Sequence, residues 1–266
     1  MGTKAAAEGA TSAGAFLFRR RSWRRIFRFA GYAIVAALSP SSYTQQAREQ
    51  AVRQVYYTAW QVIPGYVVVT AALALLLIEV VMVWARKYGI QRFSLELVLS
   101  VLVLETVPFM TALFVALRSG AAIGAEVAYM SLQGELQDEE QAGQSPLHAE
   151  LVPRVAGAAL GVAALTTIGC AVTMWVAYTV FFGFRSVGVA QFSNIVVNVF
   201  DGPELALFLF KCLLFGLAVA VIPAAAGLEA ERGVVRSVPA AVLAGLMKLF
   251  LAIVVIEAAT LVVKYA

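Results

Sequence analysis

The chain has 266 residues, with 20 Lys and Arg, 16 Asp and Glu, and one histidine. Hydrophobic residues make up 61% of the chain and charged residues only 14%, whereas soluble domains average about 25% charged residues. Together with a mean hydropathy of +0.83, this composition excludes a soluble globular domain, a disordered chain and a collagen. The two cysteines, Cys170 and Cys212, lie in apolar runs and predict neither a disulfide framework nor a metal site, and His148 alone cannot form a multi-histidine site.

The N-terminal region, residues 1–57, is basic and mixes arginines with aromatic residues. Six arginines lie between residues 19 and 28, beside apolar sequence, which suits an anionic membrane surface better than nucleic acid. Apolar side chains here fall at helical spacings of three and four residues: Trp23, Phe27, Ala30 and Ile34. We therefore predict an interfacial helix over residues 19–38 and a second helix over residues 43–57. A basic topogenic tail without fixed structure is the alternative.

The rest of the chain, residues 58–266, forms the predicted membrane domain. Five runs reach the roughly 20 apolar residues that a helix needs to cross the hydrocarbon core. They cover residues 62–85, 95–117, 155–184, 205–226 and 238–263. A β-barrel would require alternating hydrophobicity, which residues 71–78 lack. The sequence therefore predicts an all-α, polytopic fold with about five transmembrane helices.

The distribution of basic residues predicts a multi-pass membrane protein with its N-terminus in the cytoplasm and its C-terminus outside. In this orientation the one long polar stretch, residues 118–154, is cytoplasmic. It is rich in acidic residues, so a soluble partner is expected to dock there. Within it we predict a short helix over residues 133–141 that projects from the membrane.

Five ionisable side chains interrupt the apolar runs: Glu79, Glu105, Lys211, Lys248 and Glu257. Each is costly inside a membrane unless it is paired or hydrated, so all five should face the interior of the bundle. Counting 1.5 Å per residue places Glu105 and Lys248 near the midplane and the other three in the outer third. We therefore expect Glu105 to pair with Lys248, and Lys211 to pair with Glu79 or Glu257. A pairing of Glu105 with Lys211 instead is the alternative for the first contact. Such pairs either hold helices in register or line a hydrated cavity that opens and closes.

No catalytic motif is recognisable in the sequence. It has no Gly-rich phosphate loop of the Walker type, no zinc-binding His-Glu helix and no nucleophile elbow. The chain is therefore not expected to be an enzyme, and any ATP that it uses must be hydrolysed by another subunit.

Several short motifs follow one another along the chain. They are Glu105-Thr106-Val107-Pro108, Arg118-Ser119-Gly120, Ala125-Glu126, Pro146-Leu147, Pro153-Arg154 and Arg232-Gly233-Val234-Val235-Arg236. With Lys211 in the fourth span, their order and spacing resemble the MlaE-type (YrbE-like) permeases of ABC lipid transporters that work with MCE proteins. The residues that carry this resemblance most directly are Pro108, Arg118, Gly120, Pro153, Arg154, Arg232 and Arg236.

The resemblance implies a permease subunit of the inner (cytoplasmic) membrane that moves phospholipid or a similar amphipathic lipid. Its expected partners are an ABC ATPase subunit, an MCE-domain protein, a second permease copy in a homo- or heterodimer, and membrane lipid, but no nucleic acid. No cofactor is expected on this chain, and ATP-Mg is used by the partner ATPase. The family's coupling helix corresponds to residues that should contact that ATPase: Glu126, Gln133, Glu135, Leu136, Asp138 and Glu139.

Two departures from the family pattern leave alternatives open. The stretch that corresponds to the coupling helix carries acids in place of apolar contacts, and Lys248 stands where relatives tend to have an acidic residue. Both would suit a diverged permease in a heterodimer. A non-transporting membrane scaffold is one alternative. A proton-coupled secondary transporter using Glu105 is another, although the odd number of spans and the lack of an inverted repeat argue against it.

Overall fold

A computed structural model describes residues 60–90, 93–134, 152–184, 188–228 and 237–265, with residues 31, 49, 52 and 56. All elements within these ranges are helical. Five of the helices are long and apolar enough to cross a membrane, which confirms the predicted fold class. They are Trp60–Tyr88, Ser94–Gln133, Val155–Phe182, Gly202–Gly227 and Val238–Tyr265. Apart from those four single residues, the predicted N-terminal helices lie outside the described part of the chain, and the division at residue 57 stays a prediction.

The first span consists of η2 (Trp60–Val62) and α4 (Ile63–Tyr88), and it ends at Gly89, whose φ of 72° is the left-handed conformation that glycine adopts easily. Its last turn carries an aromatic and basic belt. Trp84 and Tyr88 stack with their ring centroids 5.7 Å apart, and the Lys87 ammonium lies 4.9 Å from the Trp84 ring. Amphipathic rings of this kind sit at the level of lipid headgroups, so this turn marks one membrane interface.

The second span is one long helix made of five segments. These are α5 (Ser94–Val98), η4 (Leu99–Thr106), α6 (Val107–Val115), η5 (Ala116–Gly120) and α7 (Ala121–Gln133). The predicted end at residue 117 is wrong, because the helix continues to Gln133 and turns at Gly134 (φ 83°). Residues such as Ile123, Val127 and Ala128 are buried along α7, so the helix continues because it has an apolar face to pack.

Three spanning helices and one short helix complete the described chain. They are α9 (Val152–Phe182), α10 (Val189–Val199), α11 (Gly202–Gly227) and α12 (Ser237–Tyr265). Sequence patterns did not predict α10, whose Phe192 packs edge-on against Tyr178 and Phe182 of α9. The Asp201 carboxylate accepts a hydrogen bond of 3.1 Å from the Glu204 backbone N–H and so caps α11.

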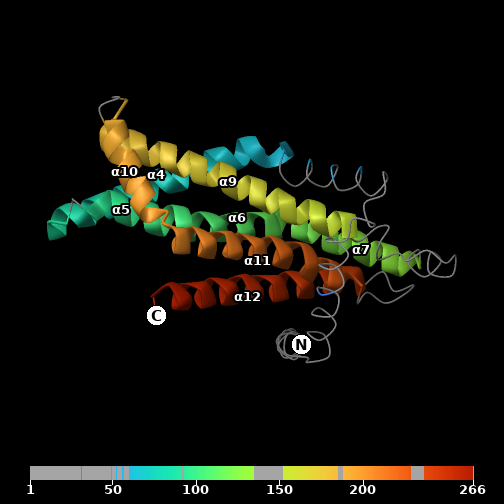
Figure 1. Cartoon of the computed structure of the whole chain (residues 1–266). Coiled ribbons are helices and arrows are strands. Elements are labelled where there is room, and N and C mark those ends of the chain that lie inside the picture. Colours follow the sequence, from blue (N-terminus) through green and yellow to red (C-terminus); the bar gives the residue numbers. More distant parts are fainter. Residues whose placement is uncertain are drawn as a thin grey trace, which may run out of the picture.

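Helix α11 lies at the centre of the bundle and packs against α12, α9, α7 and α6, while α4 packs mainly against α9 (Figure 1). Helices α5 and α10 and the last residues of α12 gather at one end, which we call the α10 end. Helix α7 reaches out at the opposite end, which we call the α7 end. The core has one apolar cluster around α11, including Phe215, Leu249 and Ile253, and a second cluster nearer the α10 end, including Ile78 and Val103.

Close contacts at glycines bring α7 and α11 together near the α7 end. A Cβ atom built on Gly227 would lie 2.7 Å from the carbonyl oxygen of Gly124 and 2.9 Å from Cβ of Val127. Since one of these neighbours is backbone, only movement of a whole helix could make room for a side chain at this position. Such close approach through small residues is typical of helix packing inside membranes.

We expect Gly227→Ala to lower the free energy of unfolding by about 1–3 kcal/mol, because it overpacks this contact. Gly65→Ala is the matched control, since a Cβ there meets nothing within 4 Å. Thermal and denaturant unfolding of the purified variants in bicelles measures both effects. Equal stability of the two variants would contradict the close contact between α7 and α11.

Candidate functional site

A cluster of charged side chains is buried between η4, α11 and α12. The Lys211 ammonium, on a residue only 1% exposed, donates a hydrogen bond to Oε2 of Glu105 and lies 2.7 Å from Oε2 of Glu257. The pairing of Lys211 with Glu257, one of the two predicted alternatives, is thereby confirmed. A single cation thus connects three spanning helices, and each charge compensates the burial of its neighbours.

Lys264 completes this cluster, although its position near the end of the chain gave no sign of it. Its ammonium lies 3.1 Å from Oε1 of Glu105, 3.3 Å from Oγ of Ser100 and 3.5 Å from Oε2 of Glu204. Helix α12 continues to Tyr265, so Lys264 still lies on a helix that packs within the bundle. Its side chain is therefore only 8% exposed. We refer to Glu105, Glu204, Lys211, Glu257 and Lys264 as the charge cluster, which holds three carboxylates and two ammonium groups.

The π-helical segment η4 positions Glu105 within its helix. The Thr106 hydroxyl donates a hydrogen bond of 3.0 Å to the carbonyl of Val101, five residues earlier, as expected for the wider π turn. Pro108 follows at the start of α6 and is buried. Because proline cannot donate a backbone hydrogen bond, a wide turn just before it accommodates the missing donor. Such π segments often occur at functional sites, and sequence periodicity does not reveal them.

The predicted pairing of Glu105 with Lys248 is wrong, and the alternative pairing of Glu105 with Lys211 is confirmed. Lys248 is fully buried, but it lies 16 residues before Lys264 on α12, which corresponds to about 24 Å along the helix. Lys264 contacts Glu105, so Lys248 is too far away to do the same. The predicted depth of Glu105 was wrong because it was counted from a second span that ends at residue 117. The actual helix runs to Gln133, which places Glu105 nearer the α10 end than the midplane.

Glu79 also departs from the prediction that it faces the interior of the bundle. It is exposed on α4, a helix that packs mainly against α9 and does not reach the charge cluster. The predicted alternative of pairing Glu79 with Lys211 is therefore wrong. Depth alone suggested this pairing, whereas the rotation of α4 decides which way the carboxylate points.

The remaining predicted residues are spread over the α7 end. Arg118 donates a hydrogen bond of 3.2 Å to Oε1 of Gln61 and so ties η5 to η2. A Cβ built on Gly120 would lie 3.3 Å from Leu249 and 3.4 Å from Pro223, so this glycine lets α12 and α11 come close. Pro153 lies in the first turn of α9, next to Arg154. The side chain of Arg154, and Arg232 and Arg236 as a whole, lie outside the described part of the chain.

Of the six residues expected to couple to an ATPase, the structure describes two. Glu126 is exposed on α7, and Gln133 is the last residue of that helix. The other four, together with most of the predicted helix over residues 133–141, lie outside the described residues: Glu135, Leu136, Asp138 and Glu139. Their role stays a prediction.

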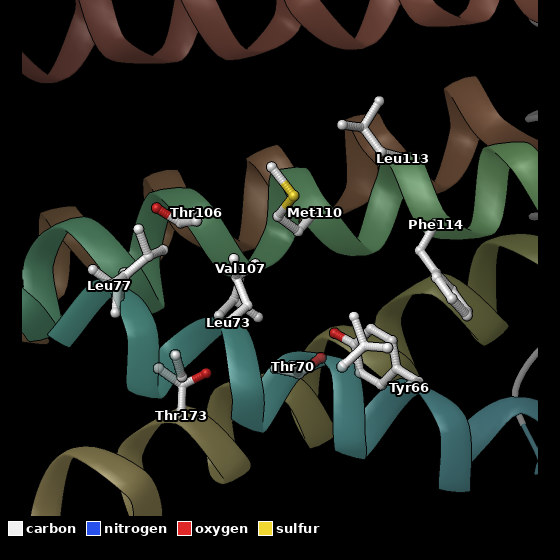
Figure 2. A pocket seen from close by; sticks show the side chains of 13 residues that line it. Tyr66, Thr70, Leu73, Leu77, Thr106, Val107, Met110, Leu113, Phe114 and Thr173 are labelled. Atoms are coloured by element: carbon white, nitrogen blue, oxygen red, sulfur yellow. The ribbon is translucent and has the colours of Figure 1, made fainter. Parts of the chain in front are cut away.

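An apolar pocket of about 190 Å³ lies between α4, α6 and α9, on a different side of the second span from the charge cluster. Leu73 and Leu77 of α4 face Val107 and Met110 of the second span (Figure 2). Tyr66 and Thr111 close one wall through a hydrogen bond of 2.5 Å between their hydroxyl groups. This pocket was not predicted, because its residues look like ordinary core positions in the sequence.

One polar atom at this apolar pocket lacks a hydrogen-bond partner among the described residues. The Thr173 hydroxyl of α9 is buried and has no hydrogen-bond partner among the described residues. Among those same residues, no group of three or more His, Cys, Asp or Glu side chains is arranged to hold a metal ion. The described part of the chain therefore offers apolar enclosure and buried charge.

We expect Lys211→Met to lower the free energy of unfolding by about 3–5 kcal/mol, because it leaves Glu105 and Glu257 without their shared cation. Lys87→Met removes an exposed lysine at the membrane interface and is the matched control, with little expected change. Unfolding in bicelles checks both variants. A similar loss of unfolding free energy in both variants would show that the buried ion pairs of Lys211 do not stabilise the fold.

Comparison with known proteins agrees with this arrangement. Residues 51–263 match the family described as "Permease MlaE". A curated relative from Synechocystis sp., named "Probable ABC transporter permease protein", is 30% identical over 150 residues, which cover 55% of this chain and 57% of the relative. The chain thus spans little more than half the length of that relative. Since the family match extends from before the first span to the last turns of α12, the chain belongs to the MlaE permease family.

Proposed function

We propose that the chain is the permease subunit of an ABC-type transporter that moves phospholipid or a similar amphipathic lipid between membranes. In this proposal a separate subunit binds ATP-Mg and hydrolyses it, a second permease copy completes a homo- or heterodimer, and an MCE-domain protein receives or delivers the lipid. The protein would reside in the inner membrane with its N-terminus and the α7 end on the cytoplasmic side. Membership of the MlaE permease family supports each of these points.

The apolar pocket is the observation that best supports a lipid as cargo. A dry apolar cavity of about 150 Å³ is enough to hold a benzene-sized group. At about 190 Å³, the pocket fits a segment of an acyl chain but not a whole lipid. Eight of its thirteen lining residues are aliphatic side chains or methionine, as an acyl chain requires: Val69, Leu73, Ala74, Leu77, Leu102, Val107, Met110 and Leu113.

One continuous helix connects the parts that such a mechanism needs. The span Ser94–Gln133 carries Leu102 and Met110 in the pocket wall and Glu105 in the charge cluster. Its far end leads from Gln133 into the residues expected to meet the ATPase. Movement imposed at that end would therefore shift the pocket wall and the charge cluster together. The π segments η4 and η5 interrupt the regular helix and are the places where it can adjust.

We expect Leu73→Trp to reduce lipid transfer by the intact complex about tenfold, because the larger ring fills the pocket. Leu160→Trp is the matched control: Leu160 lies on α9, which also contributes to the pocket wall, but it is 62% exposed and outside the pocket. ATP-dependent transfer of a fluorescent phospholipid between proteoliposomes measures the effect, and unfolding in bicelles checks that both variants are folded. Normal transfer by folded Leu73→Trp would exclude the pocket from the lipid pathway.

A non-transporting scaffold is the alternative function, and the acidic residues expected at the ATPase contact favour it. ATP hydrolysis and lipid transfer by the purified complex distinguish the two functions. A permease requires that ATP hydrolysis by the complex depend on this chain and rise when phospholipid is added. A complex that forms normally but transfers no lipid with this chain present would support the scaffold.

A further inference from the structure

Glu79 lies in the middle of the most exposed flank of α4. The helix buries the opposite flank, which carries Tyr66, Ala74, Ile78 and Ala85. At 3.6 residues per turn, a set of exposed residues falls on the same flank as Glu79: Val68, Ala72, Leu76, Val83 and Arg86. The first span is also the least buried of the five. The Glu79 carboxylate therefore points away from the protomer and makes no hydrogen bond or ion pair within the described part of the chain.

The depth of Glu79 makes this exposure unfavourable in lipid. Trp84 and Tyr88 mark the membrane interface, and Glu79 lies five residues deeper than Trp84, or about 7.5 Å along the helix. A glutamate side chain is too short to reach the headgroups from there, and ionisable groups facing the hydrocarbon are rare for this reason. Arg86, on the same flank, is two turns nearer the interface, and its Nε donates a hydrogen bond of 3.4 Å to the carbonyl of Met82. Exposure of this carboxylate to lipid is therefore costly unless a group outside the described residues covers it.

Neither the apolar pocket nor a second copy of the chain offers a suitable partner for the Glu79 carboxylate. The pocket is lined by Tyr66, Leu73 and Leu77, which lie on another flank of α4. In a symmetric contact through α4, each Glu79 would face its own copy at equal depth. Within the described ranges, Lys211, Lys248 and Lys264 point into the protein, and Arg86 and Lys87 lie at the end of α4. Arg118 is exposed but bonds to Gln61, which lies 18 residues from Glu79 along the first span. A second copy thus presents no exposed cation at the depth of Glu79.

We propose that this flank of α4 is the docking surface for a transmembrane helix of a different protein, which carries a lysine, arginine or histidine at the depth of Glu79. The paired charges would remove the cost of exposing the carboxylate to lipid. Gly65 and Ala72 lie on the same flank, and a Cβ built on Gly65 meets nothing within 4 Å, so a partner helix can approach closely. The proposal does not depend on which cargo the complex moves.

Site-specific crosslinking in native membranes tests this surface. A photoreactive benzoylphenylalanine replaces Leu76 or Val83 in the full-length chain, and Val262, exposed on α12, serves as the control position. We expect positions 76 and 83, but not 262, to capture the same transmembrane helix of another protein, with a basic residue in its membrane segment. Capture of only a second copy, only lipid, or a helix without a basic residue overturns the proposal.

Charge variants of Glu79 test whether the carboxylate makes the contact. We expect Glu79→Leu to reduce capture at position 83 at least tenfold while the isolated permease keeps or gains thermal stability, because an exposed charge has been removed from lipid. Glu96→Leu is the matched control, since Glu96 is exposed in the short helix α5. Glu79→Lys should also abolish capture, and exchange of the partner's basic residue for glutamate should restore it. Unchanged capture by Glu79→Leu, or no restoration by the double exchange, overturns the proposal.

Discussion

Burial of the Lys211 ammonium is the constraint on which the rest of the described structure depends. An ammonium group inside a membrane-spanning bundle is costly unless polar partners meet it, and the partners of Lys211 are Glu105 and Glu257, from two other spanning helices. Satisfying this one cation therefore fixes the rotation of η4, α11 and α12 at once. A second ion pair lies closer to the α10 end, where Lys264 in the last turn of α12 contacts Glu204 in the first turn of α11.

The two halves of the bundle are held together by different physical means. The half nearer the α10 end contains the charge cluster beside the apolar cluster of Ile78 and Val103, whereas at the α7 end Gly227 and Gly245 leave no room for a Cβ atom. Water entering the charge cluster would weaken only the first kind of contact, because hydration competes with ion pairs but not with close packing. Under the proposed function, the half with the charge cluster would therefore be the part that opens, and the α7 end would transmit movement as a packed unit.

Hydropathy alone predicted the correct number of spans, because an uninterrupted run of about 20 apolar residues is typical of a helix that crosses the membrane. Matching depth and opposite charge reduced the partners of Lys211 to Glu79 or Glu257, and the structure has Glu257. The same reasoning failed for Glu79 and Lys248 because helix rotation and the true length of the second span decide which groups meet. Lys264 was missed since a terminal lysine looks like a tail residue until α12 is known to continue to Tyr265. The π turn at Glu105 and the apolar pocket leave no periodic signal at all.

A double-mutant cycle between Glu105 and Lys211 tests the central claim most directly. Glu105→Gln, Lys211→Met and the double variant are unfolded in bicelles, and the interaction energy is taken from the departure from additivity. If the buried pair holds η4 and α11 together, the coupling energy is about 1–3 kcal/mol, and the double variant is less destabilised than the sum of the single variants. Additive losses, with a coupling energy below about 0.5 kcal/mol, would contradict a structure organised around Lys211.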